Sequence, residues 1–107
     1  MTETVRFSGP LEQAFIEEGY DPIGWVALSG ETADAVAAHE LARRLELGKR
    51  RGFGSVKVTA RLGASTWDTS IFPQKGRESW FMAVKVAVRR AEGLAEGDPL
   101  ELVLALR

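Results

Sequence analysis

Cysteine is absent from this chain of 107 residues, and histidine occurs once, at position 39. Without cysteine there can be no disulfide framework, no thiolate metal site and no cysteine nucleophile, so packing must stabilise the fold. A chain of this kind suits a reducing compartment, and we expect a cytoplasmic location. No apolar run approaches the ~20 residues of a membrane-spanning helix, and residues 1–10 lack the pattern of a signal peptide, so we expect no membrane partner.

An excess of one charge is also missing, because fourteen Lys and Arg stand against fifteen Asp and Glu and give a net charge of −1. Attraction for a phosphate backbone would have to come from a local cluster, so the overall charge does not favour a nucleic-acid binder. Hydrophobic residues make up 45% and charged residues 27%, as in an ordinary globular chain. The length predicts one domain over residues 1–107, because domains cluster at ~100 to 150 residues.

Alternation of apolar and polar residues predicts most of the strands. The first is interrupted by Gly9-Pro10, as in an edge strand with a bend, and residues 23–28 are nearly all apolar, which suits a strand buried on both faces. The expected strands cover residues 5–11, 23–28, 56–62, 66–72, 79–84 and 100–106.

Two helices are predicted between these strands. The first starts with Thr32 as its N-cap and ends at Gly48, and its apolar residues form a stripe that we expect to face the core. The stripe consists of Ala33, Val36, Ala37, Leu41 and Leu45. Residues 84–90 fit a strand by their alternating valines or a helix by the charged run that ends at Gly93. We favour a short helix that starts near Lys85.

The order strand, strand, helix, strand occurs twice. VRFSGPLEQ, WVAL and VKVTARL in the first half correspond to WDTSIFPQ, WFMAV and LELVLAL in the second. The identities are few, so chance similarity stays an alternative. A true repeat predicts a mainly β fold with two helices: a double-split β-barrel with a pseudo-two-fold axis, capped at its ends by the helices. Trp25, Trp67 and Trp80 would then lie in or beside the barrel.

Clustered cations precede the strand at 56–62 and form the candidate anion-binding site. Its residues are Lys49, Arg50, Arg51, Gly52, Phe53 and Gly54, and a secondary basic patch comprises Arg61, Arg89 and Arg90. Glycines expose backbone N–H groups that can hold an anion. The alternative is a solvated basic loop. The segment resembles the start of an RNA-recognition signature, but Ser55 and Val58 replace the further aromatics, and a P-loop is excluded because a strand follows the glycines.

Catalytic constellations are missing from the sequence. His39 falls on the polar side of its predicted helix, where we expect a solvated side chain, and no histidine pairs with the hydroxyl residues of 65–70. The carboxylates show no metal-loop spacing, so we expect neither a metal site nor a cofactor. An enzyme with a tryptophan-lined pocket that uses only Asp, Glu, Lys or Arg stays an alternative.

The chain resembles a small, mainly bacterial domain family of unknown function through WVAL, RGFGSVKVTARLG, WDTSIFP and KVAVRRAEGLAEGDPLELVL. The resemblance implies a double-split β-barrel and a stand-alone form, whereas other members lie beside a bacteriocin-protection domain; it implies no site residues. The passage from Arg89 to Leu104 also resembles the end of the swapped-hairpin domains of transition-state regulators and antitoxins, which bind DNA as dimers.

These observations lead to three hypotheses. The first is a non-enzymatic binding or accessory domain that takes an anionic small molecule at residues 49–54 or binds a protein partner. The second is a nucleic-acid-binding barrel that uses the same cations, and the third is the small-molecule enzyme with a tryptophan-lined pocket.

Overall fold

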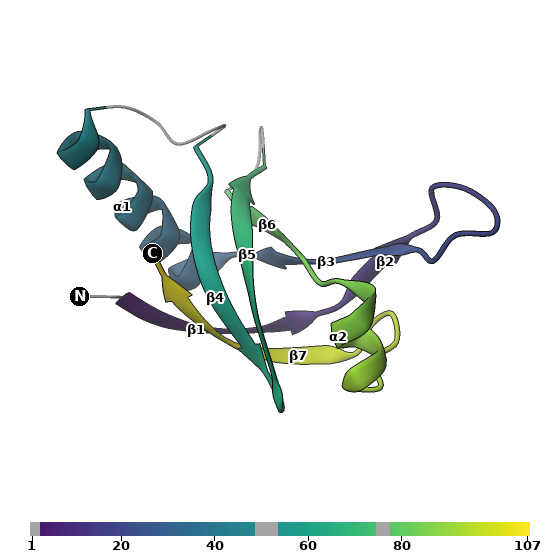
Figure 1. The fold of residues 1–107 in the computed structure, drawn as a ribbon. Coiled ribbons are helices and arrows are strands. Elements are labelled where there is room, and N and C mark those ends of the chain that lie inside the picture. The colour runs from purple at the N-terminus through teal and green to yellow at the C-terminus, as the bar shows by residue number, and fades with distance from the viewer. Residues whose placement is uncertain (1–2, 49–53, 75–77) are drawn as a thin grey trace.

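The alternating segments form the strands of one curled antiparallel sheet, which makes a half-barrel (Figure 1). The computed structural model describes residues 3–48, 54–74 and 78–107. Within these residues the strands are β1 (Glu3–Pro10), β2 (Glu12–Ala14), β3 (Ile23–Leu28), β4 (Val56–Leu62), β5 (Ser65–Pro73), β6 (Trp80–Ala83) and β7 (Pro99–Leu106), and the helices are α1 (Gly30–Leu47) and α2 (Val86–Ala91). The strand order is β1-β7-β4-β5-β6-β3-β2. Neither of these helices is long and apolar enough to cross a membrane.

The predicted strands are confirmed to within a few residues. The short helix favoured for residues 84–90 is also confirmed, as α2 with Lys85 as its N-cap. One strand was not predicted: β2 has three residues, too few for a pattern to emerge. The expectation that residues 23–28 are buried on both faces is wrong. Gly24, Val26 and Leu28 are buried, whereas Trp25 and Ala27 are only half-buried, because the outer face of β3 is not covered by a helix.

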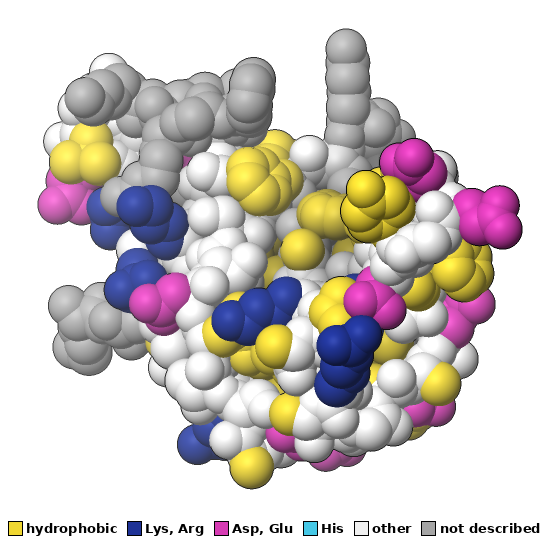
Figure 2. Space-filling view, turned by 45° about the vertical axis from the view of Figure 1, so that its right-hand side comes forward, with side chains coloured by type: hydrophobic (Ala, Val, Ile, Leu, Met, Phe, Trp, Pro, Cys, Tyr) yellow, Lys and Arg dark blue, Asp and Glu magenta, His cyan; other side chains and the backbone are white. Residues whose placement is uncertain are grey.

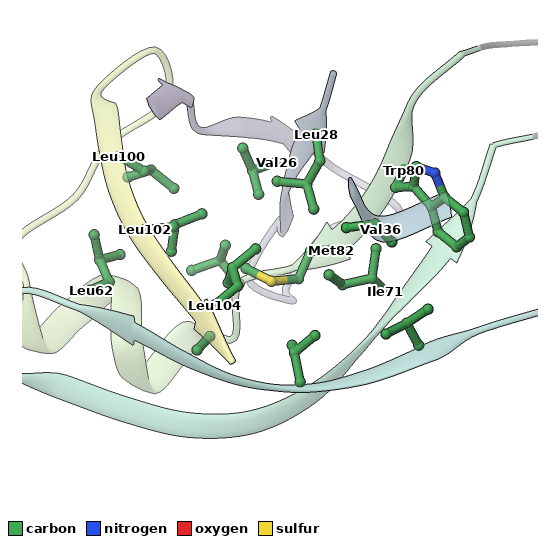
Figure 3. Close-up of a cluster of buried hydrophobic side chains, with 14 of the residues drawn as sticks. Val26, Leu28, Val36, Leu62, Ile71, Trp80, Met82, Leu100, Leu102 and Leu104 are labelled. Atoms are coloured by element: carbon green, nitrogen blue, oxygen red, sulfur yellow. The ribbon is translucent and has the colours of Figure 1, made fainter. Parts of the chain in front are cut away.

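The inner face of the curled sheet holds the core. Every second residue of β4 and β7 is buried, and side chains from β3, β5, β6 and the start of α1 meet them in one interior (Figure 3). Leu100, Leu104 and Leu106 are completely buried. Because burying one such side chain contributes roughly 1.5–3 kcal/mol, the period-two pattern of β7 makes this strand a central part of the stability.

Helix α1 differs from its prediction in where it begins and in which face it buries. It starts at Gly30 after Ser29, and the Thr32 hydroxyl donates a hydrogen bond of 2.8 Å to the Arg6 carbonyl rather than capping the helix. Only Ala33 and Val36 are buried, so the predicted core stripe is wrong beyond the second turn. The physical reason is that α1 lies against β1 and β4 with the side that carries Ala33 and Val36, and its second half borders a crevice beside the start of β4, while the leucines face away from the sheet (Figure 1).

Strand pairing is repeated between the two halves of the chain. β1 pairs with β7 in the same register as β5 pairs with β4: the pairs from Glu3↔Leu106 to Gly9↔Leu100 correspond to those from Ser65↔Leu62 to Ile71↔Val56. The β3–β6 and β4–β7 ladders each join one strand of the first half to one of the second, and each maps onto itself when the two halves are exchanged. Their end pairs are Trp25↔Ala83 with Leu28↔Trp80, and Val58↔Leu106 with Leu62↔Leu102.

One ladder has no counterpart. β5 pairs with β6, but among the described residues no ladder joins β1 to β3, although the two strands approach each other. After Pro10 the chain bends at the buried Leu11, and the short β2 pairs with β3 instead. The sheet therefore stays open between β1 and β3.

Candidate functional site

Three neighbouring strands bring two arginines to the same outer row of the sheet. Arg6 of β1 and Arg61 of β4 are both paired with Val103 of β7, which lies between them. All three point outward, because the chain neighbours of Arg61 and Val103 are buried in the core, and Val5 and Phe7 on either side of Arg6 pack against that core. Adjacent strands are about 4.8 Å apart, so the two arginine backbones are separated by roughly 10 Å, and their long side chains can reach one ligand between them.

A hollow of about 610 Å³, open to solvent, lies over this row. It is lined by Arg6, Phe7, Ser8, Arg61, Gly63, Glu101, Leu102 and Val103. Small-molecule sites typically measure ~300–1,000 Å³. The hollow is therefore large enough for a small molecule, with Val103 as an apolar floor and charged side chains around it.

The charges around the hollow do not cancel. Among the described residues no carboxylate forms an ion pair with Arg6 or Arg61, whereas Arg44, Arg90 and Arg107 each have a carboxylate within 4.0 Å. Glu101 is exposed and is paired with Ser8 one row further along, so it lies diagonal to both arginines. Among the residues that line the hollow, two guanidinium groups and one carboxylate leave an excess of one positive charge, which favours an anion; the Glu92 carboxylate lies behind Gly63 and accepts a hydrogen bond from Ser65.

Gly63 keeps one side of this hollow in shape. It occupies the β4–β5 turn with φ of +59°, and a side chain there would collide with the carboxylate of Glu92 at the end of α2. That carboxylate accepts a hydrogen bond of 2.7 Å from the Ser65 hydroxyl. The turn is thus held against α2 by a contact that only glycine permits.

The predicted loop site falls largely outside the described residues. Of its six members, residues 49–53 are not described, and Gly54 is buried just before β4 with φ of +80°. The anion site at this loop therefore stays a prediction.

The three cations of the predicted secondary patch have three different environments. Arg61 lines the hollow. Arg89 is only 7% exposed and donates hydrogen bonds of 2.9 Å to the Val84 and Pro22 carbonyls, so it ties α2 to the start of β3 and is not available to a ligand. Arg90 is exposed and pairs with Asp21 at 3.1 Å. On the face that Figure 2 shows, the Lys and Arg side chains form separate groups and not one continuous basic patch.

Arg6 is the site residue that sequence reasoning missed. Its outward position in an alternating strand was visible, but so were those of several other charged residues. What distinguishes it is the pairing of β1 with β7, which joins the first and last strands of the chain. No local pattern in the sequence indicates that pairing.

His39 is not solvated as expected, because it is half-buried between α1 and the C-terminal end of β7. Its Nε2 lies 3.2 Å from the Arg107 carbonyl oxygen, and its Nδ1 lies 3.7 Å from Glu3 Oε1. The adjoining crevice, also lined by Arg43 and Arg44, measures about 20 Å³. That is room for about one water molecule and not for a larger ligand.

The tryptophans divide between core and surface. Trp67 and Trp80 are buried in the core, whereas Trp25 is half-buried and stacks on Phe81 with ring centroids 5.9 Å apart. Trp25 lines a shallow hollow of about 260 Å³ beside Glu12 and Gln74. Throughout residues 3–48, 54–74 and 78–107 there is no group of three His, Cys, Asp or Glu side chains that could hold a metal ion.

The fold and the hollow define a small, mainly β domain with a cation-flanked recess on its outer face. A family model described as a domain of unknown function (DUF1905) matches residues 7–104, nearly the whole chain, and the protein belongs to this family. The expected membership of a domain-of-unknown-function family is confirmed. No curated protein matches the chain.

Proposed function

We propose that the protein is a non-enzymatic binding domain for a small anionic molecule, which it holds in the hollow between Arg6 and Arg61. The observation that carries this proposal is the pair of guanidinium groups on either side of one hollow, neither in an ion pair with a carboxylate of the described residues. Hydrogen bonds from guanidinium to carboxylate or phosphate are short and about twice as strong as neutral ones. One anionic group between two such donors is the ligand that these charges favour.

The rest of the lining narrows the ligand class. Ser8 and Glu101 lie at one end of the hollow and offer acceptors for an amine or hydroxyl group, while Val103 favours a short apolar segment between the two ends. We therefore propose a carboxylate- or phosphate-bearing metabolite that also carries a hydrogen-bond donor. A cytoplasmic location, predicted from the lack of cysteine, suits such a ligand.

Isothermal titration and thermal-shift measurements with phosphorylated metabolites, amino acids and hydroxy acids test the proposal. A bound ligand raises the apparent stability of the folded state. Arg6→Ala and Arg61→Ala should each weaken binding at least about tenfold, or ~1.4 kcal/mol. Arg90→Ala is the matched control, because Arg90 is exposed but lies in another hollow. Equal losses in all three variants, or unchanged binding in the first two, would refute the site.

The predicted loop is tested in the same series. Arg50→Ala combined with Arg51→Ala should leave binding in the hollow unchanged. If this variant loses binding while Arg6→Ala keeps it, the anion site is at residues 49–54 instead.

Nucleic-acid binding is the second candidate. The observation that favours it is Lys57, which is exposed on the same strand as Arg61 and extends the cations along the outer face of β4. This function predicts complexes with DNA or RNA whose affinity falls steeply with salt. Titration of duplex and single-stranded oligonucleotides at low salt distinguishes the two candidate functions. A nucleic-acid-binding protein forms complexes with these oligonucleotides, whereas a metabolite-binding protein binds the small molecule alone.

The repeated register also supports a proposal about the fold itself: a double-split β-barrel whose two halves are related by a pseudo-two-fold axis, with α1 and α2 at equivalent ends. The missing ladder between β1 and β3 is the one that would close this barrel. A crystal structure that has β1 and β3 hydrogen-bonded would establish closure, and one with the two strands apart would leave an open half-barrel.

A further inference from the structure

Helix α1 presents an apolar stripe to solvent. Its members are Ala37, Ala38, Leu41, Ala42 and Leu45, all of which are exposed. Leu41 is 46% and Leu45 is 74% exposed. Because a surface helix normally places charged or polar residues on its outward face, this stripe is the arrangement expected of a helix that packs against a second partner.

The stripe is separate from the side of α1 that packs on the sheet. Ala33 and Val36 already contact the core, and half-buried Glu40 and Arg43 continue the same side of the helix along the crevice beside β4. Leu41 follows Glu40 by one residue and therefore points about 100° away from it around the helix axis. Turning the helix to bury the leucine would expose Val36, so the sheet cannot cover the stripe.

We propose that this face is the interface of a homodimer, in which α1 of one copy packs antiparallel on α1 of the second copy about a two-fold axis near Leu41. In such a pair Leu45 of each copy lies over Ala37 of the other, so large side chains meet small ones along the seam. Small residues opposite leucines let the helix axes approach to the usual 8–10 Å. Two copies of this stripe are therefore complementary in shape.

The charges of α1 select both the orientation and the partner. Glu31 and Asp34 lie near the N-terminal end of the stripe, and two arginines, Arg43 and Arg44, lie near its C-terminal end beside Glu40, which pairs with Arg44, and the exposed Glu46. Antiparallel packing brings the acidic N-terminal end of each helix toward the arginines of its partner and aligns opposite dipole ends, whereas parallel packing would bring the two acidic ends together. Because one helix carries both signs, a second copy satisfies them without a different protein.

The size of the stripe predicts a weak dimer. An 18-residue helix is about 27 Å long, and the exposed apolar residues occupy its central half. Stable interfaces bury about 800 Å² on each partner, which one such stripe does not reach alone. We therefore expect a micromolar dissociation constant and a mixture of monomer and dimer that shifts with concentration.

Sedimentation velocity of the full chain, from low micromolar to near-millimolar concentration, tests the interface. The wild type should shift from monomer to dimer, and Leu41→Lys and Leu45→Lys should weaken this association at least about tenfold. Ile16→Lys is the matched control, because Ile16 is 75% exposed but lies in the β2–β3 loop. A wild type that stays monomeric, or a control that loses the dimer as the Leu45 variant does, would overturn the proposal.

Charge reversal tests the antiparallel arrangement separately. Asp34→Arg and Arg44→Glu should each weaken self-association, and an equimolar mixture of the two variants should recover a heterodimer, because one copy then supplies two basic ends and the other two acidic ends. Circular dichroism verifies that both variants are folded. If the mixture associates no better than either variant alone, the antiparallel pairing is wrong.

Discussion

The two helices of this domain are attached to the same sheet in opposite ways. The six-residue α2 buries Val88 and the aliphatic and guanidinium parts of Arg89, which donates hydrogen bonds to two carbonyls. The eighteen-residue α1 buries only Ala33 and Val36. Length therefore does not measure attachment. The short helix is anchored by a buried, hydrogen-bonded arginine, whereas the long one buries side chains only in its first two turns, contacts β1 and the chain end through Thr32 and His39, and keeps a free apolar face.

The largest effect is expected at the attachment of α2. Arg89→Ala removes both hydrogen bonds, leaves the Val84 and Pro22 carbonyls without these donors and opens a space beside Gly24. The free energy of unfolding should therefore fall by about 3 kcal/mol. Denaturant unfolding measures the change. Arg90→Ala removes only an exposed ion pair and should cost at most about 1 kcal/mol. Equal losses would mean that the buried hydrogen bonds do not anchor the helix.

The attachment of α1 should be weaker. Val36 is completely buried, and Val36→Ala deletes two methyl groups, which costs about 2 kcal/mol through lost burial and the cavity left behind. Hydrogen exchange of the α1 amides should increase more than that of the sheet, since the helix loses its main contact. A uniform increase in exchange across the domain would show instead that α1 and the sheet unfold as one unit.

The contact between the end of α2 and the β4–β5 turn is expected to contribute less. Gly63→Ala strains a left-handed residue and displaces the Glu92 carboxylate. Gly93→Ala is its control, because Gly93 has a similar φ of +65° but nothing within 4 Å of an added side chain. Each substitution should cost about 1 kcal/mol from backbone strain, and the Gly63 variant about 1 kcal/mol more. Equal unfolding midpoints would exclude the Glu92 contact as a source of stability.

The smallest effect on the monomer should come from the free face of α1. Leu45→Ala at concentrations below dimer formation should change stability by no more than about 0.5 kcal/mol, because the side chain is 74% exposed. A loss near that of Val36→Ala, measured by the same denaturant unfolding, would mean that Leu45 is covered within the monomer and would contradict the comparison between the two helices.

Prediction from the sequence worked where the signal is local. The strand at 56–62 and the final leucine-rich strand were found because side chains alternate with a period of two, and the end of α1 at Gly48 was found because its left-handed φ favours glycine. The same reasoning failed for Leu41 and Leu45. An apolar stripe predicts that a face is covered, but it does not say whether by the sheet or by another molecule.

The candidate site shows a similar division. Arg61 was named from the sequence as one of a basic patch with Arg89 and Arg90, yet the structure gives these three cations a hollow, a buried attachment and an exposed ion pair. The sequence showed that these three residues are cations, but it did not show what surrounds each of them in the fold. Burial of Arg89 depends on carbonyl groups of residues 84 and 22, which lie far apart in the chain and meet only through the β3–β6 pairing.

The sequence by itself determined the alternation that forms the strands, the glycines that end the helices and the absence of thiol chemistry, because each depends on residues close together or on composition alone. Only the tertiary structure decided that Arg6 and Arg61 flank one hollow and that α1 presents leucines to solvent. Both depend on which distant segments pair. The two arginines lie close together because β1 and β4 both pair with β7 at Val103, and the outward face of α1 is the side that does not contact β1 and β4.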